Sequence, residues 1–231
     1  MPYVNYYRYK SYYIVIWYFR WVEPINYYLQ QSIIYNNENL KPVLNKRVVV
    51  AISREYGSGG RYVGEIISKK LGIKFYDKAF ISEVNKETGL SEEFIKENEQ
   101  KHRVLGSFEY NNDDKLFIAE EKVIKNISKE SCVIVGRCAP YVLKDNKDTI
   151  KIFLYSSEED KIKRAIKYYN IPKNKAQKKI EKINKMRDKH YSYYTGSSLY
   201  NPSNYDLMIN VDSLGIEGTA DYIIEYIMQK K

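Results

Sequence analysis

The hydrophobic residues follow two alternating patterns from Lys46 to the end of the chain. Short apolar runs bounded by turn residues are typical of buried strands. Between them lie segments with apolar residues at every third or fourth position, a spacing typical of amphipathic helices. The predicted strands are 48–52, 73–76, 132–135, 149–155 and 207–211, and the predicted helices are 62–71, 80–87, 91–99, 115–129, 158–169, 173–193 and 217–228. Short strands separated by helices predict an α/β fold of three layers, a five-stranded parallel sheet with helices on both faces.

Residues 1–45 differ from the rest of the chain in composition. They hold both tryptophans and many tyrosines, contain no glycine and show no clear helix or strand period. The apolar run 12–19 is far shorter than the roughly 20 residues of a membrane-spanning helix, so we reject a span. Two cations precede this run, as in a signal peptide, but no small-residue cleavage site follows it. We interpret 1–45 as a poorly ordered or loosely docked appendage, and an interfacial membrane anchor through residues 12–22 is the alternative.

Length and composition narrow the class of protein. A chain of 231 residues with 44% hydrophobic residues can bury one substantial core and carry an appendage. The net charge of +9 favours anionic partners, namely nucleotides, nucleic acid or anionic lipid. Cys132 and Cys138 form neither a disulfide framework nor a metal-binding spacing, which indicates a reducing cytoplasm. We attribute the 25 tyrosines to compositional bias, so Tyr168-Tyr169 and Tyr193-Tyr194 are interpreted as helix surface and groove lining.

A glycine-rich turn joins the first predicted strand to the first predicted helix. Glycines permit positive φ and a close approach of the backbone to an anion, and the helix N-terminus faces that anion. The pattern predicts a phosphate-binding loop made of Gly57, Ser58, Gly59, Gly60, Arg61 and Tyr62. An ordinary strand-to-helix turn is the alternative.

The loop departs from the usual form, G-x-x-x-x-G-K-[ST]. Glu55 stands at the first glycine and Arg61 at the lysine, where it supplies a fixed positive charge with a bidentate fork. Tyr62 lacks the aliphatic hydroxyl that normally helps hold Mg²⁺. Ser58 lies nearby, and the sequence assigns no metal ligand.

Two other strand ends carry polar groups. Asp77 follows the second predicted strand, and Gly136-Arg137 follows the third. In an open α/β sheet, ligands bind at the carboxyl ends of the strands, so a carboxylate and a guanidinium are expected beside the glycine loop. A helix cap is the alternative role for Asp77, and a structural ion pair is the alternative role for Arg137.

Four segments are similar in order and spacing to those of a known family. They are Ile52-Ser53-Arg54-Glu55-Tyr56-Gly57-Ser58-Gly59-Gly60-Arg61, Phe75-Tyr76-Asp77-Lys78, Val133-Ile134-Val135-Gly136-Arg137-Cys138-Ala139 and Asn204-Tyr205-Asp206-Leu207. They resemble the cytidylate kinase-like family of P-loop proteins over about residues 47–230. The resemblance implies a nucleoside-monophosphate-kinase fold in a domain of residues 46–231, with a mobile helical lid at about residues 161–195.

The resemblance also implies roles for individual residues. Asp77 looks like the acid on the substrate side, and Arg137 looks like the arginine that binds the acceptor's monophosphate. The basic lid stretch would bring cations to the phosphate in transfer, with Arg164 and Arg187 as the best candidates. Where family-like chains tend to read Asp-Lys-Arg-Arg, this chain reads Asn184-Lys185-Met186-Arg187, which is a departure from the lid motif. The candidate catalytic residues are Arg61, Arg137, Arg164 and Arg187.

These features predict a cytoplasmic nucleotide kinase that uses ATP and Mg²⁺ to phosphorylate a nucleoside monophosphate, with CMP or dCMP as the expected acceptor. Its partners would be nucleotide substrates and no nucleic acid, and the sequence leaves its oligomeric state open. One alternative is a nucleotide-binding regulatory or degenerate kinase without turnover, favoured by the altered loop and lid. The other is a basic nucleic-acid-binding module, favoured by the net charge.

Overall fold

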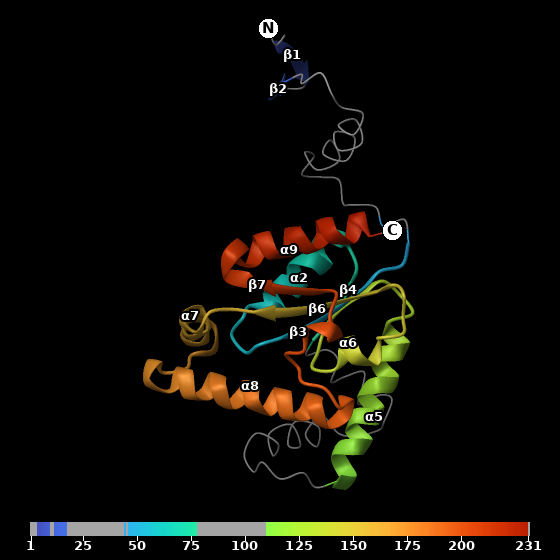
Figure 1. The fold of residues 1–231 in the computed structure, drawn as a ribbon, viewed down its shortest axis with the longest axis vertical. Helices are drawn as coiled ribbons and strands as arrows, with labels where there is room; N and C mark the ends of the chain where they lie inside the picture. The colour runs from blue at the N-terminus through green and yellow to red at the C-terminus, as the bar shows by residue number, and fades with distance from the viewer. Residues whose placement is uncertain (1–3, 10–11, 18–43, 45, 78–109, 231) are drawn as a thin grey trace. The chain divides into compact units, whose positions relative to one another are not determined.

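The computed structural model describes residues 4–9, 12–17, 44, 46–77 and 110–230 (Figure 1). The chain divides into two units, residues 1–42 and 43–231. In the first unit, β1 (Val4–Tyr9) and β2 (Tyr12–Trp17) form an antiparallel hairpin, rich in the aromatic and β-branched residues that favour strands. The sequence indicated no such strands. The predicted helices 80–87 and 91–99 lie outside the described residues.

The second unit is built on a parallel sheet (Figure 1). Its strands are β3 (Val49–Arg54), β4 (Lys74–Tyr76), β5 (Cys132–Val135), β6 (Thr149–Tyr155) and β7 (Leu207–Asn210). They lie in the order β4-β5-β3-β6-β7, and every neighbouring pair is parallel. The predicted five-stranded parallel sheet is therefore confirmed, with β3 at its centre.

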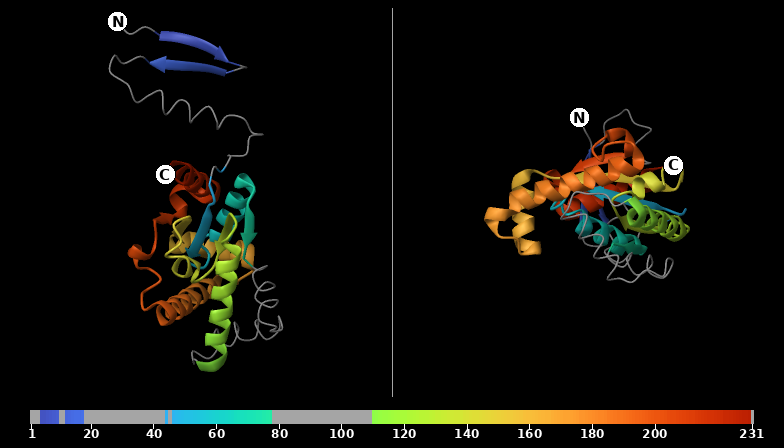
Figure 2. Two further views of the ribbon diagram at one scale, coloured as in Figure 1. Left: turned by 90° about the vertical axis from the view of Figure 1, so that its right-hand side faces the viewer. Right: turned by 90° about the horizontal axis from the view of Figure 1, so that it is seen from below.

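Helices cover both faces of this sheet (Figure 2). One face carries α2 (Gly60–Leu71) and α9 (Val211–Gln229), and the other carries α5 (Tyr110–Ile127), α6 (Ala139–Val142) and α8 (Lys173–Thr195). Alternate residues of β3 point to opposite faces. Val50 and Ile52 pack in the cluster that includes α2 and α9, whereas Val49 and Ala51 pack with α5 and α6. The three-layer architecture follows from this two-sided burial.

Local signals explain where several helices begin and end. The other helices of the described residues are α7 (Glu158–Tyr169) and a 3₁₀ turn, η2 (Pro202–Asn204). The Ser157 side chain caps α7 by accepting from the Asp160 N–H, and α7 ends at Asn170 with φ of 52°. Pro172 precedes α8, which ends at Gly196 in the left-handed region. The predicted helix 158–169 has the observed bounds of α7, and α8 runs two residues beyond its predicted end at 193.

Both cysteines are buried and unbridged. Cys132 lies in β5 and Cys138 precedes α6. Burial raises the pKa of each thiol to about 12, so both stay protonated at neutral pH. They act as core residues.

Among the residues that the structure describes, no helix combines the length and the apolar character needed to cross a membrane.

Candidate active site

The glycine-rich segment forms a tight loop between β3 and α2. Gly57 and Gly59 have φ of 84° and 85°, in the left-handed region that favours glycine. Gly59 is the N-cap of α2, and no side chain caps this helix end. The first N–H groups of an α-helix have no acceptor within the helix, so they are available to an anion bound at the loop.

Glu55, at the position of the usual first glycine, anchors the base of the loop. Its carboxylate Oε2 lies 2.8 Å from Lys161 Nζ, and both side chains are only 13% exposed. The same oxygen accepts from the Ser156 backbone N–H at 3.4 Å. Lys161 belongs to the predicted basic lid, and in the structure it forms this ion pair with Glu55. No sequence pattern linked these two residues.

Arg164, in α7, contacts the loop. Its guanidinium donates to the Gly57 carbonyl at 3.2 Å and to Ser156 Oγ at 2.6 Å, and lies 3.0 Å from Asp212 Oδ1. Ser156 follows β6 and Asp212 lies just after β7, so these contacts join further strand ends to the loop. The structure thus gives Arg164 a contact with the loop backbone.

The carboxyl group of Asp212 is held ionised by this network. Burial alone would raise its pKa, but hydrogen bonds from Ser156, Ser157 and Arg164 outweigh burial and hold the pKa well below its ordinary value. Sequence reasoning did not select Asp212. Its only local signal is an acid in the first turn of a helix.

The structure brings Arg61 and Asp77 together. Arg61 Nε lies 3.3 Å from Asp77 Oδ2 and 2.9 Å from Glu65 Oε1. Asp77 directly follows β4, so this contact joins the first turn of α2 to a neighbouring strand end. The positive charge at the lysine position of the loop is therefore shared between two carboxylates.

A second group of cations gathers where β3 and β5 end. Ser53 Oγ donates to the Arg137 carbonyl at 3.0 Å, and Arg137 Nη2 lies 3.9 Å from Glu120 Oε1. Arg187, from α8, donates to the carbonyl of Arg54 at 2.9 Å. Burial lowers the pKa of Arg187, and the charges of Arg54 and Arg137 lower it further. The predicted residue Arg187 thus contacts the end of β3, and the predicted residue Arg137 follows the neighbouring strand β5.

Helices α7 and α8 also contact the loop through aromatic and amide side chains. The Tyr56 ring stacks on Tyr169, with ring centroids 5.0 Å apart, and the Tyr62 ring packs on Tyr168 at 4.9 Å. Asn184 Oδ1 accepts from the Tyr56 N–H at 2.7 Å. Tyr168 and Tyr169 remain about 40% exposed, so they line the helix surface as expected and touch the loop as well. The segment predicted to be the lid therefore contacts the glycine-rich loop.

The described residues do not form the usual Mg²⁺ site of a phosphate-binding loop. Tyr62 brings no aliphatic hydroxyl, and the Ser58 hydroxyl is buried and donates to the Glu55 carbonyl at 3.0 Å. In the described part of the chain, no cluster of three acidic, histidine or cysteine side chains is arranged for a metal ion.

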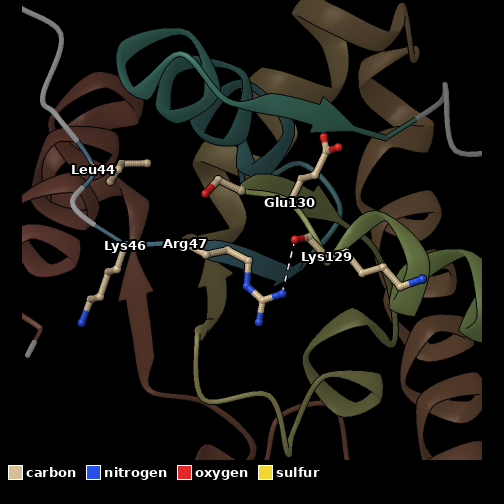
Figure 3. A pocket seen from close by; sticks show the side chains of 6 residues that line it. Leu44, Lys46, Arg47, Lys129 and Glu130 are labelled. Carbon is tan, nitrogen blue, oxygen red and sulfur yellow. Dashed lines mark hydrogen bonds between the residues drawn. The ribbon is translucent and has the colours of Figure 1, made fainter.

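One pocket lies away from the loop, beside the amino ends of β3 and β5 (Figure 3). It is lined by Leu44, Lys46, Arg47, Lys129, Glu130 and Ser131. Arg47 donates to the Lys129 carbonyl at 3.3 Å and to Asp148 at 2.9 Å. Since open α/β sheets bind ligands at the carboxyl ends of their strands, this pocket is not the candidate active site.

Comparisons with known structures agree with the fold. Shikimate kinase from Acinetobacter baumannii superposes with a TM-score of 0.50 at 18% identity, covering 80% of this chain and 96% of that one. This likeness shows the fold of a P-loop kinase. An uncharacterized protein from Eubacterium ventriosum superposes with a TM-score of 0.64 at 27% identity, covering 80% of this chain and all of that one.

Sequence comparison defines the family. The model of the cytidylate kinase-like family matches residues 49–213, and the chain belongs to that family. Proteins named cytidylate kinase, from Sulfurisphaera tokodaii and Staphylothermus marinus, are 28% and 25% identical to it over 78% of this chain and 95% and 96% of their own lengths. Family and fold together identify the chain as a phosphotransferase.

Proposed function

We propose that the protein is a nucleotide kinase that transfers the γ-phosphoryl group of ATP to a nucleoside monophosphate, with CMP or dCMP as acceptor. The observation that carries this proposal is the meeting of a glycine loop with Arg137 and Arg187 at one edge of the sheet. Family membership and two relatives named cytidylate kinase support the acceptor class.

In this proposal, the donor's phosphates bind the backbone of residues 57–60 and the first turn of α2. ATP would arrive as its Mg²⁺ complex, since Tyr62 brings no aliphatic hydroxyl to the loop. Arg61 completes the donor site from the first turn of the helix. Arg164 and Lys161 act as positioning residues, because the first binds the Gly57 carbonyl and the second binds Glu55.

Arg137 and Asp77 would place the acceptor, and Arg187 would neutralise charge on the phosphoryl group during transfer. Phosphoryl transfer depends on positioning and charge stabilisation, so the site needs no covalent nucleophile. The tyrosine contacts of α7 and the Asn184 contact of α8 with the loop would exclude water and so prevent hydrolysis of ATP. Residues 1–45 would be an appendage outside this catalytic domain.

A regulatory protein that binds nucleotide without turnover is the second candidate. The observation that favours it is the pairing of Arg61 with Glu65 and Asp77, which reduces the charge available at the lysine position of the loop. Cytoplasmic location and the absence of a nucleic-acid partner stay predictions.

The role of Arg137 is testable by substitution. We expect Arg137→Ala to lower kcat/KM for CMP by about 10- to 100-fold, because hydrogen bonds between charged groups contribute about 1.5–3 kcal/mol. Initial rates of ADP formation would be measured at varied concentrations of CMP and, separately, of ATP. The matched control is Arg47→Ala, two residues before β3 begins, which should leave both constants unchanged (Figure 3). An unchanged kcat/KM for CMP in Arg137→Ala would show that the acceptor binds elsewhere.

A further inference from the structure

Asn184 is a buried amide in the interior of helix α8. The residue is 9% exposed, and the buried residues one and two turns away along α8 are Ala176, Ile180 and Tyr191. A hydrophobic residue would continue this buried face, and asparagine is a weaker helix former than alanine or leucine. Neither the helix nor its packing explains the amide. A residue that departs from local preferences in this way is expected where function requires it.

The amide binds the backbone that leads into the glycine loop. Asn184 Oδ1 accepts from the Tyr56 N–H at 2.7 Å, one residue before Gly57. Tyr56 also packs against the buried cluster that includes Ile180, and its ring stacks on Tyr169 of α7 at 5.0 Å. Tyr56 is therefore held between α7 and α8, and α8 contacts both its side chain and its N–H.

A second hydrogen bond holds the backbone on the other side of Tyr56. Arg164, from α7, donates to the Gly57 carbonyl at 3.2 Å. Between these two bonds the chain turns into the left-handed region, with φ of 84° at Gly57. One bond from each helix thus sets how the chain enters the loop. The N–H groups that follow can bind a phosphate only when they point toward it, so this entry controls their alignment.

We propose that Asn184 is a positioning residue for the donor's phosphates, because its bond to the Tyr56 N–H couples the packing of α8 to the orientation of the loop. The proposal deepens the proposed function and rests on its binding of ATP at residues 57–60. Asn184 itself does not touch the phosphates, and its effect passes through the backbone of Tyr56 and Gly57. A carboxylate oxygen could accept the same hydrogen bond, whereas leucine has the same branched shape and no acceptor.

The test compares Asn184→Leu with Asn184→Asp in the full-length protein. Calorimetric titration with ATP and Mg²⁺, without CMP, gives the Kd of each variant. Leucine continues the hydrophobic face of α8, so we expect this variant to fold. It should raise the Kd for ATP at least about tenfold, because the Tyr56 N–H loses its acceptor and the loop must shift to find another. Asn184→Asp keeps an acceptor and should stay within about threefold of the wild type.

Gln177→Leu is the matched control. It removes an exposed amide two turns earlier in α8, whose printed partner is Glu181 at 3.2 Å, and it should bind ATP like the wild type. Where turnover is measured, Asn184→Leu should raise the KM for ATP by the same factor as the Kd and keep the KM for CMP within about twofold. A general loss of structure would raise both KM values.

The positioning role is overturned if the wild type binds no ATP, if Asn184→Leu binds ATP like the wild type, or if Gln177→Leu loses as much affinity. It is also overturned if Asn184→Asp is as weak as Asn184→Leu. If Asn184→Leu does not fold, Asn184→Ala, which also lacks the acceptor, decides in the same way. ATP binding that depends on Asn184, with no turnover of any monophosphate, would refute the kinase function and leave this role standing.

Discussion

Gly57→Ala is expected to lower kcat/KM for ATP by about 100-fold or more, because misplacing a site by about 1 Å costs on that order. Gly57 has φ of 84°, and a Cβ there would stand 2.9 Å from the carbonyl oxygen of Lys161 and 3.2 Å from its Cα. Both atoms belong to the backbone of α7, so the clash cannot be relieved by the movement of a flexible side chain. The loop must shift, and its N–H groups lose their alignment with the phosphates. Initial rates at varied ATP would measure the loss.

Gly196→Ala is the control for this substitution. Gly196 also has positive φ, at 69°, but a Cβ there meets no atom within 4 Å. It therefore carries the same type of backbone strain, about 1–2 kcal/mol, without the clash. We expect Gly196→Ala to lower stability slightly and to keep its kcat/KM for ATP. Equal losses of activity in both variants would mean that strain alone, and not the packing of the loop on α7, explains the effect.

Asp212→Asn is expected to lower the free energy of unfolding at pH 7 by about 2–3 kcal/mol, since breaking a buried pair leaves an uncompensated charge on its partner. The partner here is Arg164, whose side chain is 14% exposed, and the Asp212 side chain is 18% exposed. Hydrogen bonds from Ser156 and Ser157 to the carboxylate would weaken as well. Urea unfolding would measure the change.

The loss of stability in Asp212→Asn is expected to depend on pH. The folded-state pKa of Asp212 is lowered, so its contribution to stability is present above the unfolded pKa of about 4 and is lost as the pH falls toward the folded pKa. The gap in stability between wild type and Asp212→Asn should therefore shrink below about pH 4. Asp221→Asn, which breaks an exposed pair with Lys70, is the control and should cost less than about 1 kcal/mol. Equal stability of the two variants at pH 7 would contradict the role given to Asp212.

The sheet and most helices could be predicted because burial leaves a local trace in the sequence. The strand Cys132–Val135 was predicted to the residue, since its apolar run stops at polar Ser131 and at Gly136. The helix α6 was missed because four residues are too few to show a helical period. The start of α9 was missed because Gly215, with φ of 69° and ψ of 175°, interrupts the helix after its first turn.

Only part of the candidate site could be predicted from the sequence. Strand ends pointed to Asp77 and Arg137, and the glycine loop pointed to Arg61, because these positions follow from order along the chain. Contacts between distant segments left no such trace, and they include Glu55 with Lys161, Arg164 with Asp212, and Asn184 with the Tyr56 N–H. Each of these pairs joins residues about 50 to 130 positions apart that share no periodic pattern, so only the folded chain reveals them.

We expect the altered loop to support phosphoryl transfer to a nucleoside monophosphate. The most direct measurement is the separation of products after incubation of the purified full-length protein with ATP, Mg²⁺ and CMP. We predict ADP and CDP in equal amounts, and neither product above background when CMP or the protein is omitted. Binding of ATP without formation of CDP, or of any other diphosphate from a panel of monophosphates, would contradict the claim and favour a regulatory nucleotide-binding protein.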